Sequence, residues 1–131
     1  DEVLHHMGKP GKQSLIEFKK MFDDLNKESG KKQFLTYYLI AAHPGCKESH
    51  MHELKQFTTH ELKINPEQAQ VFTPTPGTYS AVMYYTELDP FTKKKIFVEK
   101  DTLRKERQKE IVVAKKSFCK TKQNSNSGMQ G

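Results

Sequence analysis

The stretch HPGCKESHMH, residues 43–52, holds three histidines and one of the two cysteines of the chain. Imidazoles and thiolates are common zinc ligands, so the candidate ligands are His43, Cys46, His50 and His52. His50 and His52 are two residues apart in a predicted helix and therefore project toward nearly opposite faces. His43 and Cys46 bracket a Pro-Gly turn and could share an ion, but two ligands hold zinc poorly. We therefore predict no metal site here.

The position of this stretch suggests a different role. It follows the apolar run FLTYYLIAA, residues 34–42, which is typical of a strand buried on both faces of a parallel sheet. A shorter strand, AQVFT at 69–73, leads into TPTPGT at 73–78. Ligands bind at the carboxyl ends of parallel strands, and glycine allows a close backbone approach. The two Pro-Gly exits could line one pocket, or could simply be stiff turns.

Helical patterns surround these strands. A helix is predicted over 13–29, with Ser14 and Glu17 as a capping box and Gly30 as its end. Its apolar stripe is expected to face the core; the members are Leu15, Phe18, Phe22 and Leu25. A second helix is predicted over 48–62. The order helix, strand, helix, strand indicates an α/β fold.

The second helix lacks a good cap, because Lys47 occupies the position where Ser or Thr is preferred. We therefore expect this helix to begin late, near Ser49. Its inward residues are expected to be Met51, Leu54, and Phe57 or Thr58.

The pattern changes after residue 78. YSAVMYYT at 79–86 and KKIFVE at 94–99 flank a turn at 88–92 and predict an antiparallel hairpin. A polar helix is predicted over 101–116, anchored by Leu103, Ile111, Val112 and Val113. We expect three regions: an α/β part over 1–78, the hairpin and helix over 79–116, and a disordered tail over 117–131.

Composition narrows the class of protein. The chain has 131 residues, which suits one domain, with 34% hydrophobic and 29% charged residues. No apolar run reaches the roughly 20 residues that cross a bilayer, and the first residues lack a signal-peptide pattern. Two distant cysteines favour a reducing compartment, so we expect a cytoplasmic protein without membrane partners. The start at Asp1, inside a helical pattern, suggests a piece of a longer protein.

The net charge of +6 is unevenly distributed. Residues 93–122 contain twelve Lys or Arg and four Asp or Glu. This segment could bind a phosphate backbone, or could be a solvated helix face with a basic tail.

Four segments in series resemble the YgiQ-type radical SAM proteins: LHHMGKPGK, QFLTYYLIAAHPGC, QAQVFTPTPGT and MYYTELDPF. The resemblance covers about residues 1–100. It implies the C-terminal part of a partial (β/α)6 barrel, with 34–42 as its fifth strand and 69–73 as its sixth. The hairpin and basic helix would be a family-specific C-terminal region.

The resemblance also implies chemistry. Such enzymes bind a [4Fe–4S] cluster through a C-x-x-x-C-x-x-C loop, cleave S-adenosylmethionine and abstract hydrogen from a substrate. That loop is absent from this sequence, so the chain alone is expected to be inactive and to bind neither the cluster nor S-adenosylmethionine. The complete protein would need its cluster-bearing barrel half and an electron donor.

By this resemblance, the exits of the two strands would contact S-adenosylmethionine. The cofactor-binding candidates are Ile40, Ala41, Ala42, His43, Val71, Phe72, Thr73 and Pro74. His43, Tyr84 and Tyr85 are candidates for substrate contact, although ordinary loop and core roles remain open for them. Two alternatives stand beside the enzyme hypothesis: residues 93–122 bind nucleic acid, or the C-terminal region only completes the barrel.

Overall fold

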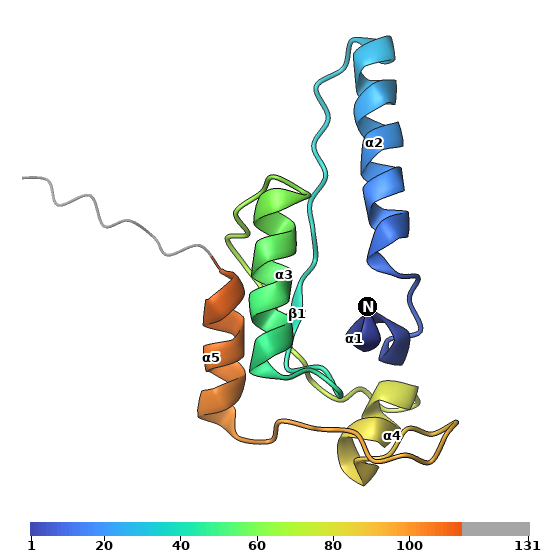
Figure 1. Cartoon of the computed structure of the whole chain (residues 1–131), viewed down its shortest axis with the longest axis vertical. Coiled ribbons are helices and arrows are strands. Elements are labelled where there is room, and N and C mark those ends of the chain that lie inside the picture. Colours follow the sequence, from blue (N-terminus) through green and yellow to red (C-terminus); the bar gives the residue numbers. More distant parts are fainter. Residues whose placement is uncertain (114–131) are drawn as a thin grey trace, which may run out of the picture.

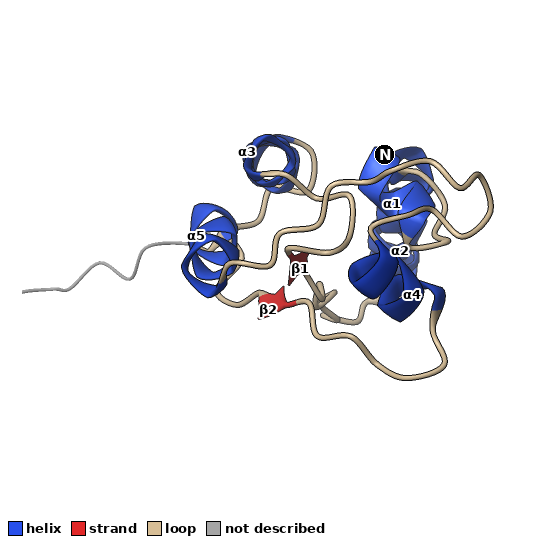
Figure 2. Cartoon of the chain, turned by 90° about the horizontal axis from the view of Figure 1, so that it is seen from below, coloured by secondary structure: helices blue, strands red, loops and turns tan. Residues whose placement is uncertain are grey.

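The structure, a computed structural model, describes residues 1–113. Its elements are α1 (Glu2–His6), α2 (Lys12–Ser29), β1 (Ile40–Ala41), α3 (Glu48–His60), β2 (Gln70–Val71), α4 (Tyr79–Thr86) and α5 (Thr102–Val112). Helices α3 and α5 lie side by side, α2 projects away from them, and α4 lies beyond the far end of α1 (Figure 1). In the view from below, β1 and β2 lie between two groups of helices (Figure 2). One group is α3 and α5, and the other is α1, α2 and α4.

The two strands are parallel, as the sequence predicts. Ile40 is in register with Gln70, and Ala41 with Val71. The amide of Phe72 donates to the carbonyl of Ala41 at 2.8 Å. The Pro-Gly exits of both strands therefore leave from the same edge of the sheet.

Both strands are much shorter than predicted. The segment 34–39 leads into β1 but forms no strand with any described residue. Its side chains alternate: Leu35, Tyr37 and Leu39 are half-buried, whereas Phe34 is 88% and Tyr38 73% exposed. The prediction that this run is buried on both faces is thus wrong for this chain, because nothing described here covers its outer face.

The core lies where α3 and α5 meet the sheet. Met51 of α3 and Val112 of α5 are fully buried together with Ala41 and Cys46. Thr58, rather than Phe57, is the other buried residue of α3. The Lys55 ammonium donates to the carbonyl of Val112 at 3.1 Å and so satisfies the C-terminal end of α5.

Helix α3 begins at Glu48 and not late, which corrects the expectation drawn from Lys47. His50 performs the capping in place of Ser or Thr. Its Nδ1 accepts the Lys47 amide at 3.1 Å, while the His50 amide donates to the carbonyl of Lys47.

Helix α2 begins at Lys12, with Gly11 as its N-cap, so the predicted capping box at Ser14 and Glu17 is wrong. The Asp1 carboxylate instead accepts the Lys12 amide at 2.7 Å. Gly30 ends the helix at φ +65°, as predicted. The helix buries none of its residues, and its apolar stripe remains largely open; Phe18 is 48% and Leu25 57% exposed.

The predicted hairpin is wrong: residues 79–86 form helix α4. The Thr78 hydroxyl accepts the amide of Ala81 at 3.1 Å and starts the helix, and Glu87 ends it in the left-handed region. Residues 94–99 form no strand, and one isolated bridge joins Leu88 to Lys95. The turn between them is confirmed, because the Asp89 carboxylate accepts two backbone amides there.

Helix α5 is capped by Asp101, whose carboxylate accepts the amide of Arg104 at 2.9 Å. Leu103 was predicted to be an anchor but is 81% exposed, whereas Val112 is fully buried. The rest of the predicted helix, 114–116, and the predicted tail lie outside the described residues. None of the described helices is long and apolar enough to cross a membrane.

Candidate functional site

The loop His43–Cys46, called the HPGC loop below, forms the exit of β1 and is buried throughout. Gln108 of α5 holds it at both ends. The Ala42 amide donates to Gln108 Oε1 at 3.1 Å, and Gln108 Nε2 donates to the Cys46 carbonyl at 3.4 Å. One buried side chain thus satisfies two buried backbone groups of a turn that lies more than 60 residues away in the chain.

His43 is 3% exposed, and each of its ring nitrogens has a partner. Nδ1 lies 2.9 Å from the carbonyl of Pro44, and Nε2 lies 2.9 Å from the Ser80 hydroxyl. A carbonyl can only accept, so Nδ1 carries the proton and Nε2 of the neutral ring accepts from Ser80. Burial lowers the pKa of His43 below its usual value, which favours this neutral form.

The Ser80–His43 pair has the spacing of a nucleophile and its base. The pair lacks the access that nucleophilic attack requires, because His43 is nearly inaccessible and Ser80 is itself half-buried. Its evident effect is to tie the start of α4 to the exit of β1.

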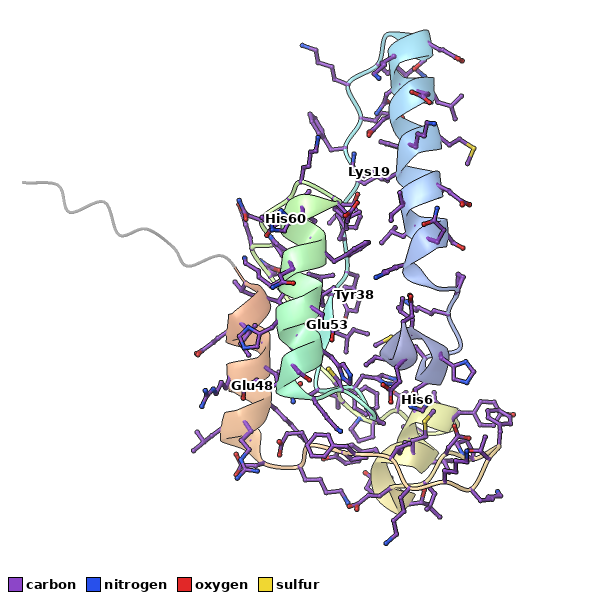
Figure 3. The ribbon with its side chains drawn as sticks, in the orientation of Figure 1. His6, Lys19, Tyr38, Glu48, Glu53 and His60 are labelled. Carbon is purple, nitrogen blue, oxygen red and sulfur yellow. The ribbon has the colours of Figure 1, made fainter. Side chains whose placement is uncertain are left out.

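Gly45 is needed for two reasons. It has φ +86°, and a Cβ there would lie 2.5 Å from Cδ2 of His6. Its amide donates to the carbonyl of Phe97 at 2.7 Å, which draws the segment before α5 against the loop. Figure 3 shows His6 on α1 next to α4.

The Nδ1 side of the His6 ring, opposite the side near Gly45, faces the carboxylate of Asp89. His6 Nδ1 is buried, lies 3.7 Å from Asp89 Oδ2, and has no hydrogen-bond partner among residues 1–113. The amides of Thr92 and Phe91 hold the pKa of Asp89 below its usual value, so this carboxylate is ionised. The contact between His6 and Asp89 places α1 beside the turn after α4.

The exit of β2 is more open than that of β1. Val71, Phe72 and Pro74 are half-buried, and Thr73 is exposed. The ring of Phe72 packs edge-on against His43, with centroids 5.0 Å apart.

Phe72 also begins a row of aromatic rings. Its centroid is 5.9 Å from that of Tyr84, which is 5.3 Å from that of Tyr85. The Lys105 ammonium donates to the Tyr84 hydroxyl at 2.8 Å and lies over the Tyr84 ring. Both tyrosines predicted from the sequence are therefore connected to the strand exits.

The zinc candidates have other partners in the fold. Burial raises the pKa of the Cys46 thiol to about 11, and its Sγ lies 3.4 Å from Met51 Sδ. His50 caps α3, and His52 is exposed. Among residues 1–113, no three His, Cys, Asp or Glu side chains are placed to hold a metal ion.

The structure therefore brings the two predicted groups of residues, Ile40–His43 and Val71–Pro74, to one edge. Sequence reasoning missed the residues that fix this edge, namely His6, Ser80 and Gln108. A signal for Gln108 was available, because it is four residues before Val112 and so shares the buried face of α5. No local signal marked His6 or Ser80, whose partners are distant in the chain.

Part of the chain matches a known family model. Residues 67–129 match a family model described as "Domain of unknown function (DUF3362)". This match begins just before β2 and covers the exit of β2, α4 and α5.

Particular relatives extend the similarity toward the rest of the chain. The chain is 61% identical over 116 residues to UPF0313 protein FN0734 of Fusobacterium nucleatum, covering 88% of this chain and 20% of the relative. It is 43% identical over 115 residues to a UPF0313 protein of Thermotoga neapolitana, again covering 88% and 20%. A UPF0313 protein of Methanosarcina acetivorans is 43% identical over 110 residues, covering 84% and 15%.

The chain thus spans about a fifth or less of the length of these curated relatives and is similar to one part of UPF0313 proteins. No solved structure matches the chain significantly.

Proposed function

We propose that this chain is the C-terminal part of a radical SAM enzyme and supplies one edge of its S-adenosylmethionine pocket. One observation carries the proposal: β1 and β2 are parallel and adjacent, and their Pro-Gly exits share an edge. That is the arrangement implied by the resemblance to YgiQ-type proteins, and ligands of α/β folds bind at such edges.

The chain itself does not fit an iron–sulfur cluster. A cluster needs several thiolates on accessible loops. Cys46 is 2% exposed, and burial holds its pKa near 11, so the thiol stays protonated. The cluster ligands must therefore come from the remainder of a longer polypeptide, which the 20% coverage of the relatives allows.

The residues at the strand exits fit S-adenosylmethionine in part. Ala41, Ala42 and His43 are covered by the described chain, so they shape the edge without an open surface of their own. Ile40 and the β2 exit, Val71–Pro74, retain accessible surface and are the proposed contacts. The exposed Thr73 could offer a hydroxyl and Phe72 an aromatic ring to a nucleoside.

When bound in the complete protein, the cluster and S-adenosylmethionine would supply reductive cleavage of a sulfonium bond and abstraction of hydrogen from a substrate. An external reductant would provide the electron. The residues of this chain would position S-adenosylmethionine at the strand exits and exclude water from it. Neutral His43 and Gln108 keep the HPGC loop closed, and the ring of Phe72 covers His43.

The remainder of the polypeptide is the proposed partner. The extended segment 34–39 leaves Phe34 and Tyr38 exposed, and α2 beside it leaves Phe18 and Leu25 exposed. Figure 3 shows Tyr38 on this segment and Lys19 on the adjoining α2. A further strand and its helix, as a (β/α) barrel requires, would cover these surfaces. We place the complete enzyme in the cytoplasm, where the free thiol of Cys46 is stable.

Binding of S-adenosylmethionine tests the proposal. Equilibrium dialysis of the full-length polypeptide against labelled S-adenosylmethionine is expected to show binding that weakens at least tenfold in Phe72→Ala. Phe91→Ala, which changes an exposed ring away from the strands, is the control and should bind as the parent does. No binding by the parent, or equal loss in both variants, would contradict the proposed pocket.

A further inference from the structure

A surface beside the candidate site combines exposed aromatic rings with lysines. The rings lie on α4 and in the segment after it, with exposures of 63% for Tyr79, 71% for Tyr85, 71% for Phe91 and 42% for Phe97. Lys93, Lys94 and Lys95 are also exposed and lie between Phe91 and Phe97 in the chain. We call these seven residues the aromatic–lysine surface.

Two of the four rings are in direct contact. Tyr79 on α4 and Phe91 in the turn pack together, with centroids 4.9 Å apart. Tyr79, Val82 and Tyr85 are spaced by three residues and line one face of α4. Val82 is also open, at 45% exposure. Tyr79 and Tyr85 are therefore about 9 Å apart along the helix axis, at 1.5 Å per residue.

Acidic side chains near the lysines are already engaged. Asp89 and Glu99 are buried, and each carboxylate accepts backbone amides. Asp101 caps α5, and Glu87 pairs with Lys100 at 2.6 Å.

Within residues 1–113, Lys93 and Lys94 remain free to meet another anion, whereas Lys95 also lies near the Glu87 carboxylate and, after Lys100, helps to lower its pKa. Lys93, Lys94 and Lys95 have no acidic partner within salt-bridge distance among the described residues. The fold therefore turns a segment of mixed sequence charge into a surface whose outward charge is positive.

We propose that the aromatic–lysine surface binds single-stranded nucleic acid. Exposed rings offer stacking platforms for unpaired bases, and the lysines match the phosphate backbone. A buried protein interface would disfavour three adjacent lysines at its centre, since charged residues are depleted there. The sequence alone gave weaker support, because the rings of α4 join those near the lysines only through the fold.

This inference stands apart from the proposed S-adenosylmethionine pocket. Its residues do not include the strand exits, so either proposal can fail without the other.

The test is fluorescence anisotropy of the 131-residue chain with a labelled 15-nucleotide oligo(U). Its affinity is compared with that for an abasic oligomer of equal length, from 50 to 300 mM salt.

The variant Lys94→Ala/Lys95→Ala is expected to lower the slope of log affinity against log salt by about 1.4, the value for two single-strand phosphate contacts. Tyr85→Ala/Phe91→Ala is expected to weaken oligo(U) binding at least tenfold and to leave binding of the abasic oligomer unchanged. The control, Lys31→Ala/Lys32→Ala, removes two exposed lysines next to α2 and should bind as the parent does, with circular dichroism confirming folding of each variant.

Three results would overturn the proposal. One is the absence of oligo(U) binding at 50 mM salt. Another is binding that none of the surface substitutions weakens, which would assign it to the basic residues after 113. The third is equal weakening in the control, which would show a general charge effect.

Discussion

The amide of Ala42 at the end of β1 donates to the side chain of Gln108 on α5, across 66 residues of chain. Ala42 has φ +56°, a conformation that a non-glycine residue adopts only when its surroundings hold it there. Gln108 supplies that restraint and also donates to the Cys46 carbonyl. The C-terminal helix α5 therefore sets the shape of the exit of β1.

Replacement of Gln108 should destabilise the fold. Gln108→Leu leaves the Ala42 amide and the Cys46 carbonyl buried without partners, so we expect a loss of about 1–3 kcal/mol in the free energy of unfolding. Urea denaturation measures the loss. Gln56→Leu, at an exposed position of α3, is the control and should change stability by less than about 0.5 kcal/mol. Equal effects of the two substitutions would show that the two hydrogen bonds of Gln108 to the HPGC loop do not stabilise the fold.

The reactivity of Cys46 reports closure of the HPGC loop. Its pKa is raised from 9.0 to about 11 by burial, so the thiolate fraction at pH 8 should be about a hundredfold lower than in the unfolded chain. We expect modification by a thiol reagent at least that much slower in the folded protein, and faster in Gln108→Leu. The measurement uses a Cys119→Ser background, which leaves one thiol. Rapid labelling of the folded parent would show that the loop is open.

Gly45 and Gly77 form a matched pair. Both have positive φ, +86° and +78°, so alanine costs about 1–2 kcal/mol at each. At Gly45 the added methyl also meets His6, whereas nothing lies near it at Gly77. We expect Gly45→Ala to be clearly more destabilising in thermal or urea unfolding. Combining it with His6→Ala should recover part of the difference, and a strictly additive double variant would exclude this contact.

Stability should fall on acidification because of His43. Its folded pKa lies below 6.5, mainly through burial, with His6 and Lys9 acting in the same direction and the Pro44 carbonyl opposing them. The unfolded chain binds the proton more tightly, so this contribution is complete above about pH 6.5 and is lost as the pH falls toward the folded pKa. Urea unfolding at pH 7.5 and 5.5 should show the drop, and His43→Gln should reduce it. Exposed His52→Gln should leave the drop intact; the same reduction in both would point to another group.

The sequence predicted correctly those features of the fold that depend on residues close together in the chain and on the order of the elements. The C-terminal end of α2 at Gly30 and the turn at Asp89 follow from glycine and Asx chemistry. The parallel pairing of β1 with β2 follows from the order of apolar runs and helices.

Failures occurred where a local capping signal was missed or where distant residues decide. Residues 79–86 carry aromatic and β-branched side chains that suit a strand, but the Thr78 cap and burial of Ala81 and Met83 select a helix. Asp1 displaced Ser14 from capping because it lies beside the start of α2 only in the fold. The candidate site shows the same difference. The strand exits were predictable from the sequence, whereas the hydrogen bonds of Gln108 to the exit of β1 were not.

Formation of 5′-deoxyadenosine tests the central claim most directly. The full-length polypeptide, reconstituted without oxygen with iron and sulfide, would be mixed with S-adenosylmethionine and dithionite, and the product quantified by mass spectrometry. We expect multiple turnovers in the parent and at least a tenfold lower rate in Phe72→Ala, with the cluster absorbance unchanged. A fully loaded protein that forms no 5′-deoxyadenosine, or a Phe72→Ala variant as active as the parent, would contradict the account.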